Sequence, residues 1–215
     1  MPLRAWALWI AAALAFAPSL RAQPNRVNRL GAGSILVASR GLLDPNFAHT
    51  VVFIAQYSES GGVMGLVINK RSKIAISEAL SVPEAKGRTD PLYLGGPVER
   101  TTLMALGRLP GPSGGAVNVL GDVYLVVDKT LLKKTLASSK GDSGMRIYAG
   151  YGGWSGPQLR QEVNAGAWYI MQGSAAVVFD ANPASLWTRL IEKFESSVAM
   201  NFRPNGTTGQ RPDSQ

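Results

Sequence analysis

The feature that most constrains this fold is a stretch in which four glycines surround one tryptophan, Gly150–Leu159. It lies between the strand-like Met145–Ala149 and the helix-like Gln158–Asn164. Glycine loses more conformational freedom on folding than any other residue, so such a cluster indicates positive φ angles or a close approach of two backbones. The pattern favours a tight strand-to-helix crossover with Trp154 as its packing anchor over a loop that cradles a ligand.

Composition limits the chemistry that the chain can carry. The 215 residues suit one domain plus appendages, and 46% hydrophobic residues with 17% charged ones allow a substantial core. The absence of cysteine excludes disulfides, thiolate metal sites and cysteine nucleophiles. His49 is the single histidine, so a metal site with several histidines from one chain is excluded as well.

The N-terminus predicts a secretory signal peptide over Met1–Ala22. Arg4 precedes the apolar run Ala5–Leu20, which is shorter than the roughly 20 residues that a membrane span needs. We therefore expect cleavage after Ala22, a periplasmic or secreted protein, and no stable transmembrane segment after processing. The alternative is a membrane anchor formed by an uncleaved N-terminus. The expected organisation is then a linker at 23–29, a single domain at 30–200 and a disordered polar tail at 201–215.

The chain is basic, with a formal net charge of +8. A basic protein can bind nucleic acid, an anionic membrane surface or an acidic polymer. Here the charges are scattered, and the densest groups, Lys70–Lys73 and Lys133-Lys134, are interpreted as solvated faces. The expected export of the protein argues against nucleic acid as its partner.

Local patterns predict a mixture of strands and helices without internal repeats. Expected strands cover 34–39, 50–57, 63–69, 91–94, 101–106, 122–127 and 146–149. The second and third of these are expected to pair as an antiparallel hairpin, and 167–171 with 175–179 as a closing hairpin. Expected helices cover 75–80, 130–137 with Asp128 as N-cap, and 183–194 with Asn182 as N-cap.

Several motifs, in their order along the chain, resemble the YqgE/AlgH family. They are Gly33–Ala38, Asp44–Phe47, Gly65–Lys70, Leu94–Val98, Gly150–Leu159, Ala167-Trp168 and Phe179-Asp180. The resemblance covers roughly Leu30–Phe194. It implies an α+β fold with a bifurcated, largely antiparallel β-sheet curled into a pseudo-barrel with flanking helices. It implies no established enzymatic activity or cofactor, and only a loose label of transcriptional regulator. The family's typical members look cytoplasmic, so the signal-like N-terminus is a departure.

Three loops are candidates for one ligand-binding surface: Asp44–Phe47, Gly95–Val98 and Gly150–Gln158. The candidate residues are Asp44, Asn46, Asn69, Gly95, Gly96, Gly152, Gly153, Trp154 and Gln158. Each also has a structural interpretation, which is favoured. Asp44 and Asn46 commonly cap turns, and Asn69 can set one. Gly95-Gly96 could expose backbone N–H groups to an anion, but no phosphate-loop motif is present.

Three hypotheses for function follow. We favour a non-enzymatic binding or regulatory protein of the cell envelope whose partner is an unknown protein or an anionic ligand. The alternatives are a nucleic-acid-associated transcriptional regulator and a hydrolase of a phosphorylated or saccharide substrate. The hydrolase would need two carboxylates, or His49 with an acid, brought together by the fold. No catalytic residue, metal or cofactor is predicted.

Overall fold

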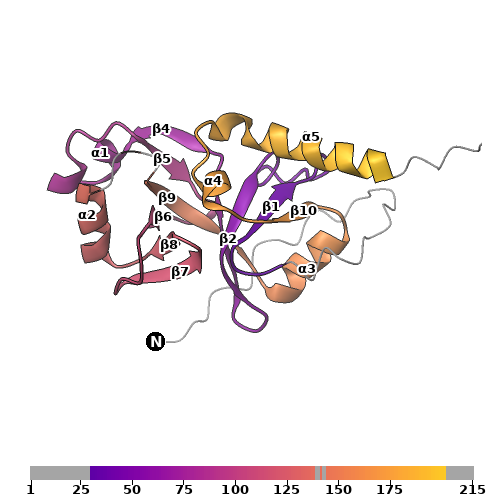
Figure 1. Ribbon diagram of the computed structural model, residues 1–215, viewed down its shortest axis with the longest axis horizontal. Helices are drawn as coiled ribbons and strands as arrows, with labels where there is room; N and C mark the ends of the chain where they lie inside the picture. Colours follow the sequence, from indigo (N-terminus) through magenta and orange to yellow (C-terminus); the bar gives the residue numbers. More distant parts are fainter. Residues whose placement is uncertain (1–29, 139–140, 142–143, 202–215) are drawn as a thin grey trace, which may run out of the picture.

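The computed structural model describes residues 30–138, 141 and 144–201 (Figure 1). The predicted signal peptide 1–22, the linker 23–29 and the tail from 202 onward lie outside the described residues. In the part of the chain that is described, no helix combines the length and the apolar character required to cross a membrane.

One sheet runs through the described chain. Its main path follows the order β10-β1-β2-β3-β9-β6-β8-β7, and β4 and β5 branch off at β9. Neighbouring strands are antiparallel except that β5 runs parallel to β9. The strands are β1 (Ser34–Ala38), β2 (Val51–Ser58), β3 (Gly62–Val67), β4 (Arg71–Ala75), β5 (Pro91–Leu94), β6 (Val98–Arg108), β7 (Ala116–Leu120), β8 (Val123–Val126), β9 (Met145–Trp154) and β10 (Trp168–Gln172).

Strand β9 joins the two halves of the sheet. Its first part pairs with β5 and β6, and its last residues pair with β3. Gly150, with φ of 69°, lies between these two parts. The glycine–tryptophan run is therefore mostly strand, and the predicted end of this strand at Ala149 was wrong. The predicted tight connection from strand to helix, with Trp154 buried beside it, is confirmed. The strand continues to Trp154, and Ser155 alone separates it from the next helix. The glycines allow the strand to bend between the two halves.

The sheet curls strongly on itself. A Cβ atom on Gly33 would lie 3.3 Å from the Val119 carbonyl oxygen, and one on Gly173 would lie 3.2 Å from the Leu120 side chain. The end of β7 thus returns to the opposite end of the sheet, where β1 and β10 pair. The predicted α+β fold with a curled, largely antiparallel sheet is confirmed as a half-barrel.

Helices cover two hydrophobic cores. The larger core fills the half-barrel around β1–β3 and β10, with α5 packed against β1 (Figure 1). The smaller core lies around β6, β8 and the start of β9, beside α2. The helices are α1 (Ile76–Ala79), the 3-10 helix η2 (Pro83–Ala85), α2 (Lys129–Ser138), α3 (Gly156–Asn164), α4 (Ala175–Val178) and α5 (Pro183–Asn201).

Several local predictions are confirmed. β2 and β3 form the expected antiparallel hairpin. Asp128 begins α2, because its Oδ1 accepts from the Leu131 backbone N–H at 2.8 Å. Pro183 is the first residue of α5, as predicted.

Others were wrong. Residues 175–178 form the short helix α4, so β10 pairs with β1 instead of closing a hairpin. The Ser174 hydroxyl accepts from the Val177 N–H and so caps the start of α4. The sequence prediction missed this N-cap because the apolar residues that follow Ser174 are typical of a strand. Helix α5 continues to Asn201, beyond the predicted end at 194. Strands β4 and β7 were not predicted: β4 begins with the polar residues Arg71, Ser72 and Lys73, and β7 is a short strand that directly follows a loop rich in proline and glycine.

Candidate functional site

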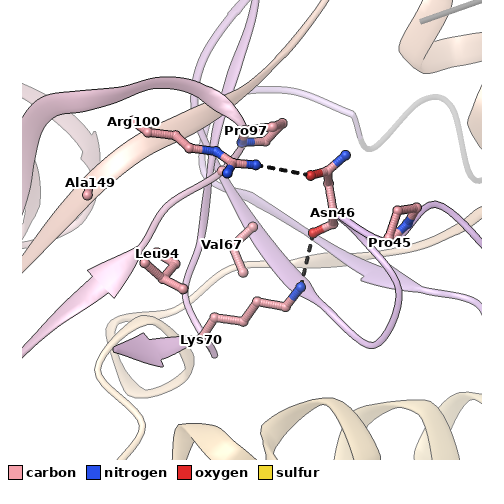
Figure 2. Close-up of a pocket in the computed structure, with 9 residues that line it drawn as sticks. Pro45, Asn46, Val67, Lys70, Leu94, Pro97, Arg100 and Ala149 are labelled. Carbon is pink, nitrogen blue, oxygen red and sulfur yellow. Dashed lines mark hydrogen bonds between the residues drawn. The ribbon is translucent and has the colours of Figure 1, made fainter. Parts of the chain in front are cut away.

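A pocket of about 220 Å³ lies where the two halves of the sheet meet. Its lining comes from five separate segments of the chain, which Figure 2 shows converging. The lining residues are Pro45, Asn46, Val67, Lys70, Leu94, Gly96, Pro97, Arg100 and Ala149. Five of them are apolar and two are cationic. We refer to this site as the junction pocket.

Lys70 enters the junction pocket from the segment between β3 and β4. Its Nζ donates to the backbone oxygen of Asn46 at 3.1 Å. The side chain is half-buried, and this burial lowers the pKa of Lys70, although the nearby charge of Asp44 acts in the opposite direction. A smaller fraction of Lys70 is therefore protonated at a given pH than for a solvated lysine.

Arg100 reaches the pocket from a break in β6. The pairing of β6 with β9 is interrupted between Val98 and Leu103, and Glu99 has a positive φ of 46°. This irregular segment lies directly on Gly150, where a Cβ would be 2.7 Å from the Val98 carbonyl oxygen and 3.1 Å from the Arg100 Cα. The absence of a side chain at Gly150 therefore lets the segment that carries Arg100 approach β9.

Asn46 lies between the two cations. Its backbone oxygen accepts from Lys70, and its Oδ1 faces Arg100 Nη2 at 3.5 Å, a long contact (Figure 2). Asp44 holds this residue in place, because its Oδ1 accepts from both the backbone N–H of Asn46 at 2.8 Å and its Nδ2 at 3.1 Å. The predicted turn-capping role of Asp44 is confirmed.

Aromatic side chains fix the turn that follows Asn46. The Phe47 ring lies 5.0 Å from the Trp154 ring and 5.8 Å from the Trp168 ring, centroid to centroid. His49 has a positive φ of 58°, and its ring contacts Trp187 edge-on at 4.3 Å. His49 is thus held as a structural residue of the turn.

Asn69 ties the end of the same turn to the sheet. Its Oδ1 accepts from the Val51 N–H at 2.8 Å, and its Nδ2 donates to the His49 carbonyl oxygen at 3.0 Å. Both ends of its amide are therefore used inside the protein. The structural interpretation of Asn69 as a residue that sets the turn is confirmed.

Two of the three predicted loops meet at the junction pocket. Asn46 and Gly96 line it, and Asp44 supports it. Gly95 lies beside it, but its N–H donates to the Ala149 carbonyl oxygen at 2.9 Å, so it offers no donor to an anion. The structure requires glycine at position 96 for two reasons. Its φ is 155°, and a Cβ atom there would overlap the backbone of Tyr151.

The third predicted loop, Gly150–Gln158, supports the fold instead of lining the pocket through its candidate residues. Gly152 and Gly153 pair with β3 inside the sheet. Trp154 is 5% exposed, and its Nε1 donates to the Glu162 carboxylate at 3.2 Å. Gln158 donates to the same carboxylate at 3.0 Å. None of these four residues lines the junction pocket, but Trp154 contacts Phe47 of the first loop.

Sequence reasoning missed the two cations of the site. Lys70 belongs to the basic group that was interpreted as a solvated face, and the structure instead places it in the pocket. A usable signal was its position directly after Asn69, at the end of a buried strand. Arg100 had no such signal, because its placement depends on the break in β6 and on its contact with Gly150.

The pocket is suited to binding an anion. Within the described residues, neither Lys70 nor Arg100 has a carboxylate within 4.0 Å. The lining contains no carboxylate and no histidine. Across the described ranges, no group of three or more histidine or acidic side chains is placed to hold a metal ion. Positive charge, one amide and apolar walls are the chemistry available.

The structure defines a mixed α+β protein whose sheet curls into a half-barrel, with a cationic pocket where the two halves of the sheet join. The AlgH-like family model matches residues 35–199. The chain therefore belongs to the AlgH-like family.

Relatives support this assignment. A UPF0301 protein of Chlorobaculum tepidum is 33% identical over 168 residues, covering 78% of this chain and 88% of the relative. A UPF0301 protein of Thermobifida fusca is 34% identical over 181 residues, with the same two coverages. The solution structure of the AlgH protein from Pseudomonas aeruginosa aligns with a TM-score of 0.63 at 23% identity, over 87% of this chain and 99% of that one. This last likeness concerns the fold alone.

Proposed function

We propose that the chain is a non-enzymatic binding protein that takes a small organic anion in the junction pocket. The observation that carries the proposal is the convergence of Lys70 and Arg100 on one pocket, with no carboxylate within 4.0 Å of either cation in the described chain. The ligand that fits is a carboxylate or phosphate with a short apolar portion, because about 220 Å³ is small for a ligand site and most of the lining is apolar.

Asn46 supports this proposal because its oxygens already accept from both cations. An incoming anion can replace these neutral acceptors with oxygens that carry a negative charge, which adds the attraction between opposite charges to both hydrogen bonds. The arginine can bind a carboxylate through two parallel N–H groups, and the lysine provides a point charge.

The test is isothermal titration with L-lactate and with inorganic phosphate. We expect the double variant K70Q/R100Q to lose binding of both probes by at least about tenfold, since one such hydrogen bond contributes roughly 1.5–3 kcal/mol. The matched control K73Q/K86Q removes the same charge from exposed lysines outside the pocket lining. Equal affinities of the two double variants would contradict the proposal.

The two alternatives have less support. A hydrolase would need a general base at the pocket, and the only charged groups in the lining are cations. A nucleic-acid regulator would need a continuous basic face. In the described chain, Arg40, Arg108, Arg160 and Arg189 are each paired with a carboxylate, so their charges are partly neutralised. Binding of the small anions but not of duplex DNA at the same salt concentration would separate these functions.

We propose in addition that Met1–Ala22 directs export and that the ligand is met outside the cytoplasm. The short positive segment and the 16-residue apolar run support this. Fractionation of cells followed by N-terminal sequencing tests it. A periplasmic or secreted chain that starts at Gln23 is the expected result, and an intact cytoplasmic chain would contradict it.

A further inference from the structure

We propose that the Lys70 amine captures the carbonyl carbon of a small oxo acid as a reversible imine, while Arg100 binds the carboxylate of the same molecule. This inference rests on the proposed function, because it names the class of anion that the junction pocket takes. It adds a covalent step to what would otherwise be ionic binding.

The placement of the two cations suits a molecule with two adjacent polar groups. Lys70 Nζ lies 3.1 Å from the backbone oxygen of Asn46, and Arg100 Nη2 lies 3.5 Å from the Oδ1 of the same residue. The two nitrogens therefore flank one asparagine, and each contacts one of its oxygens. In a 2-oxo acid the carbonyl carbon is bonded directly to the carboxylate carbon, so one small molecule presents both groups to the two cations.

The environment of Lys70 favours a nucleophilic amine. Within the described residues its amine has a neutral backbone oxygen as partner and no carboxylate within 4.0 Å. Apolar side chains, among them Val67 and Leu94, form much of the wall. Burial lowers the pKa of this lysine, which raises the fraction of free amine, and the charge of Asp44 partly opposes this effect. Arg100 lines the same pocket from β6. Desolvation in an apolar pocket is a known way to activate a lysine.

The chemistry is balanced without an oxidant or a metal. The lone pair of the neutral Nζ attacks the carbonyl carbon, and one proton moves from this nitrogen to the former carbonyl oxygen to give a neutral carbinolamine. A second proton, taken from solvent, converts the hydroxyl group to water. Loss of this water leaves a protonated imine, in which a carbon–nitrogen double bond replaces the carbon–oxygen one. Hydrolysis runs the same steps in reverse and releases the oxo acid unchanged.

The experiment uses pyruvate as probe and sodium borohydride as trap. Borohydride delivers a hydride to the imine and converts it to a stable secondary amine, which intact mass and peptide mapping locate. We expect one adduct, at Lys70, and at least a tenfold loss of adduct in K70R. The matched variant K73R changes an exposed lysine three residues away and should keep the adduct at Lys70.

Two further probes separate the roles of the cations. R100Q should reduce trapping of pyruvate, which carries a carboxylate, and leave trapping of acetone, which carries none, within about twofold. Trapping should increase as the pH rises, because the neutral amine is the nucleophile.

Failure of this inference is distinguishable from failure of the proposed function. L-Lactate has the carboxylate but no carbonyl, so its titration reports ionic binding alone. Lactate binding without a pyruvate adduct at Lys70 would overturn the imine and leave the anion site in place. Adducts spread evenly over the lysines, or an adduct that persists unchanged in R100Q, would also overturn it.

Discussion

Gly96 illustrates how single residues fix the junction pocket. The backbone at Gly96 adopts φ of 155°, a region that is essentially restricted to glycine, and any Cβ there would overlap the backbone of Tyr151 in β9. Gly150 has the complementary role, since its missing side chain accommodates the segment that carries Arg100. The glycines of the two motifs therefore hold two strands together closely enough to place the cations.

Replacing Gly96 by alanine should destabilise the protein by roughly 3 kcal/mol or more, because both the backbone conformation and the contact with β9 oppose a Cβ. Urea unfolding measures the change. Gly87→Ala is the matched control: Gly87 also has a positive φ, of 78°, but nothing lies within 4 Å of its added Cβ. The control should cost about 1 kcal/mol. Equal losses in the two variants would show that the packing of Gly96 on β9 is unimportant.

At the scale of the secondary-structure element, the segment just before helix α5 fixes this helix to the sheet. Arg146 is 1% exposed and donates to the backbone oxygens of Val178 and Asp180 at 2.7 and 2.6 Å. The Asp180 carboxylate accepts from Arg189 on α5 at 2.7 Å and from the Asn182 N–H at 2.8 Å. Together these bonds connect β9, α4 and α5.

The Asp180 anchor predicts a pH dependence of stability. Burial acts to raise the pKa of Asp180. The hydrogen bonds from Arg189 and the Asn182 N–H, together with the positive charges of Arg189 and Arg146, outweigh it, so the pKa of Asp180 is lowered overall. On acidification the unfolded chain is protonated first, so the contribution is complete above the unfolded pKa of about 3.9 and is lost as the pH falls through the folded pKa.

Asp180→Asn should therefore lower the free energy of unfolding by about 1–2 kcal/mol at pH 7 and by little at pH 2. Urea unfolding at both pH values is the measurement. Asp122→Asn, which removes a more exposed ion pair with Arg108, should change stability by less than about 1 kcal/mol. A loss in D180N that is the same at both pH values would contradict the role of the carboxylate charge.

On the scale of the whole molecule, the sequence predicted local strands better than their connections. Alternating apolar and β-branched residues were sufficient to predict the strands β1, β2 and β3. The order of the family motifs along the chain was sufficient to predict the curled sheet. The run Gly150–Trp154 could not be interpreted from sequence alone, because its glycines serve contacts with distant segments at Gly96 and Val98. The same limit applies to the site: of the three loops that were predicted to form one surface, two line the pocket, and Arg100 is placed there by long-range packing.

Chemical-shift mapping on the uniformly ¹⁵N-labelled protein tests the junction pocket most directly, because it locates the ligand as well as detecting it. During titration with L-lactate against a sodium chloride control, we predict saturable shifts grouped on the backbone amides of Asn46, Lys70, Gly96 and Arg100. Shifts that match the chloride control, or that gather on Lys133 and Lys134 instead, would contradict an anion site at this pocket.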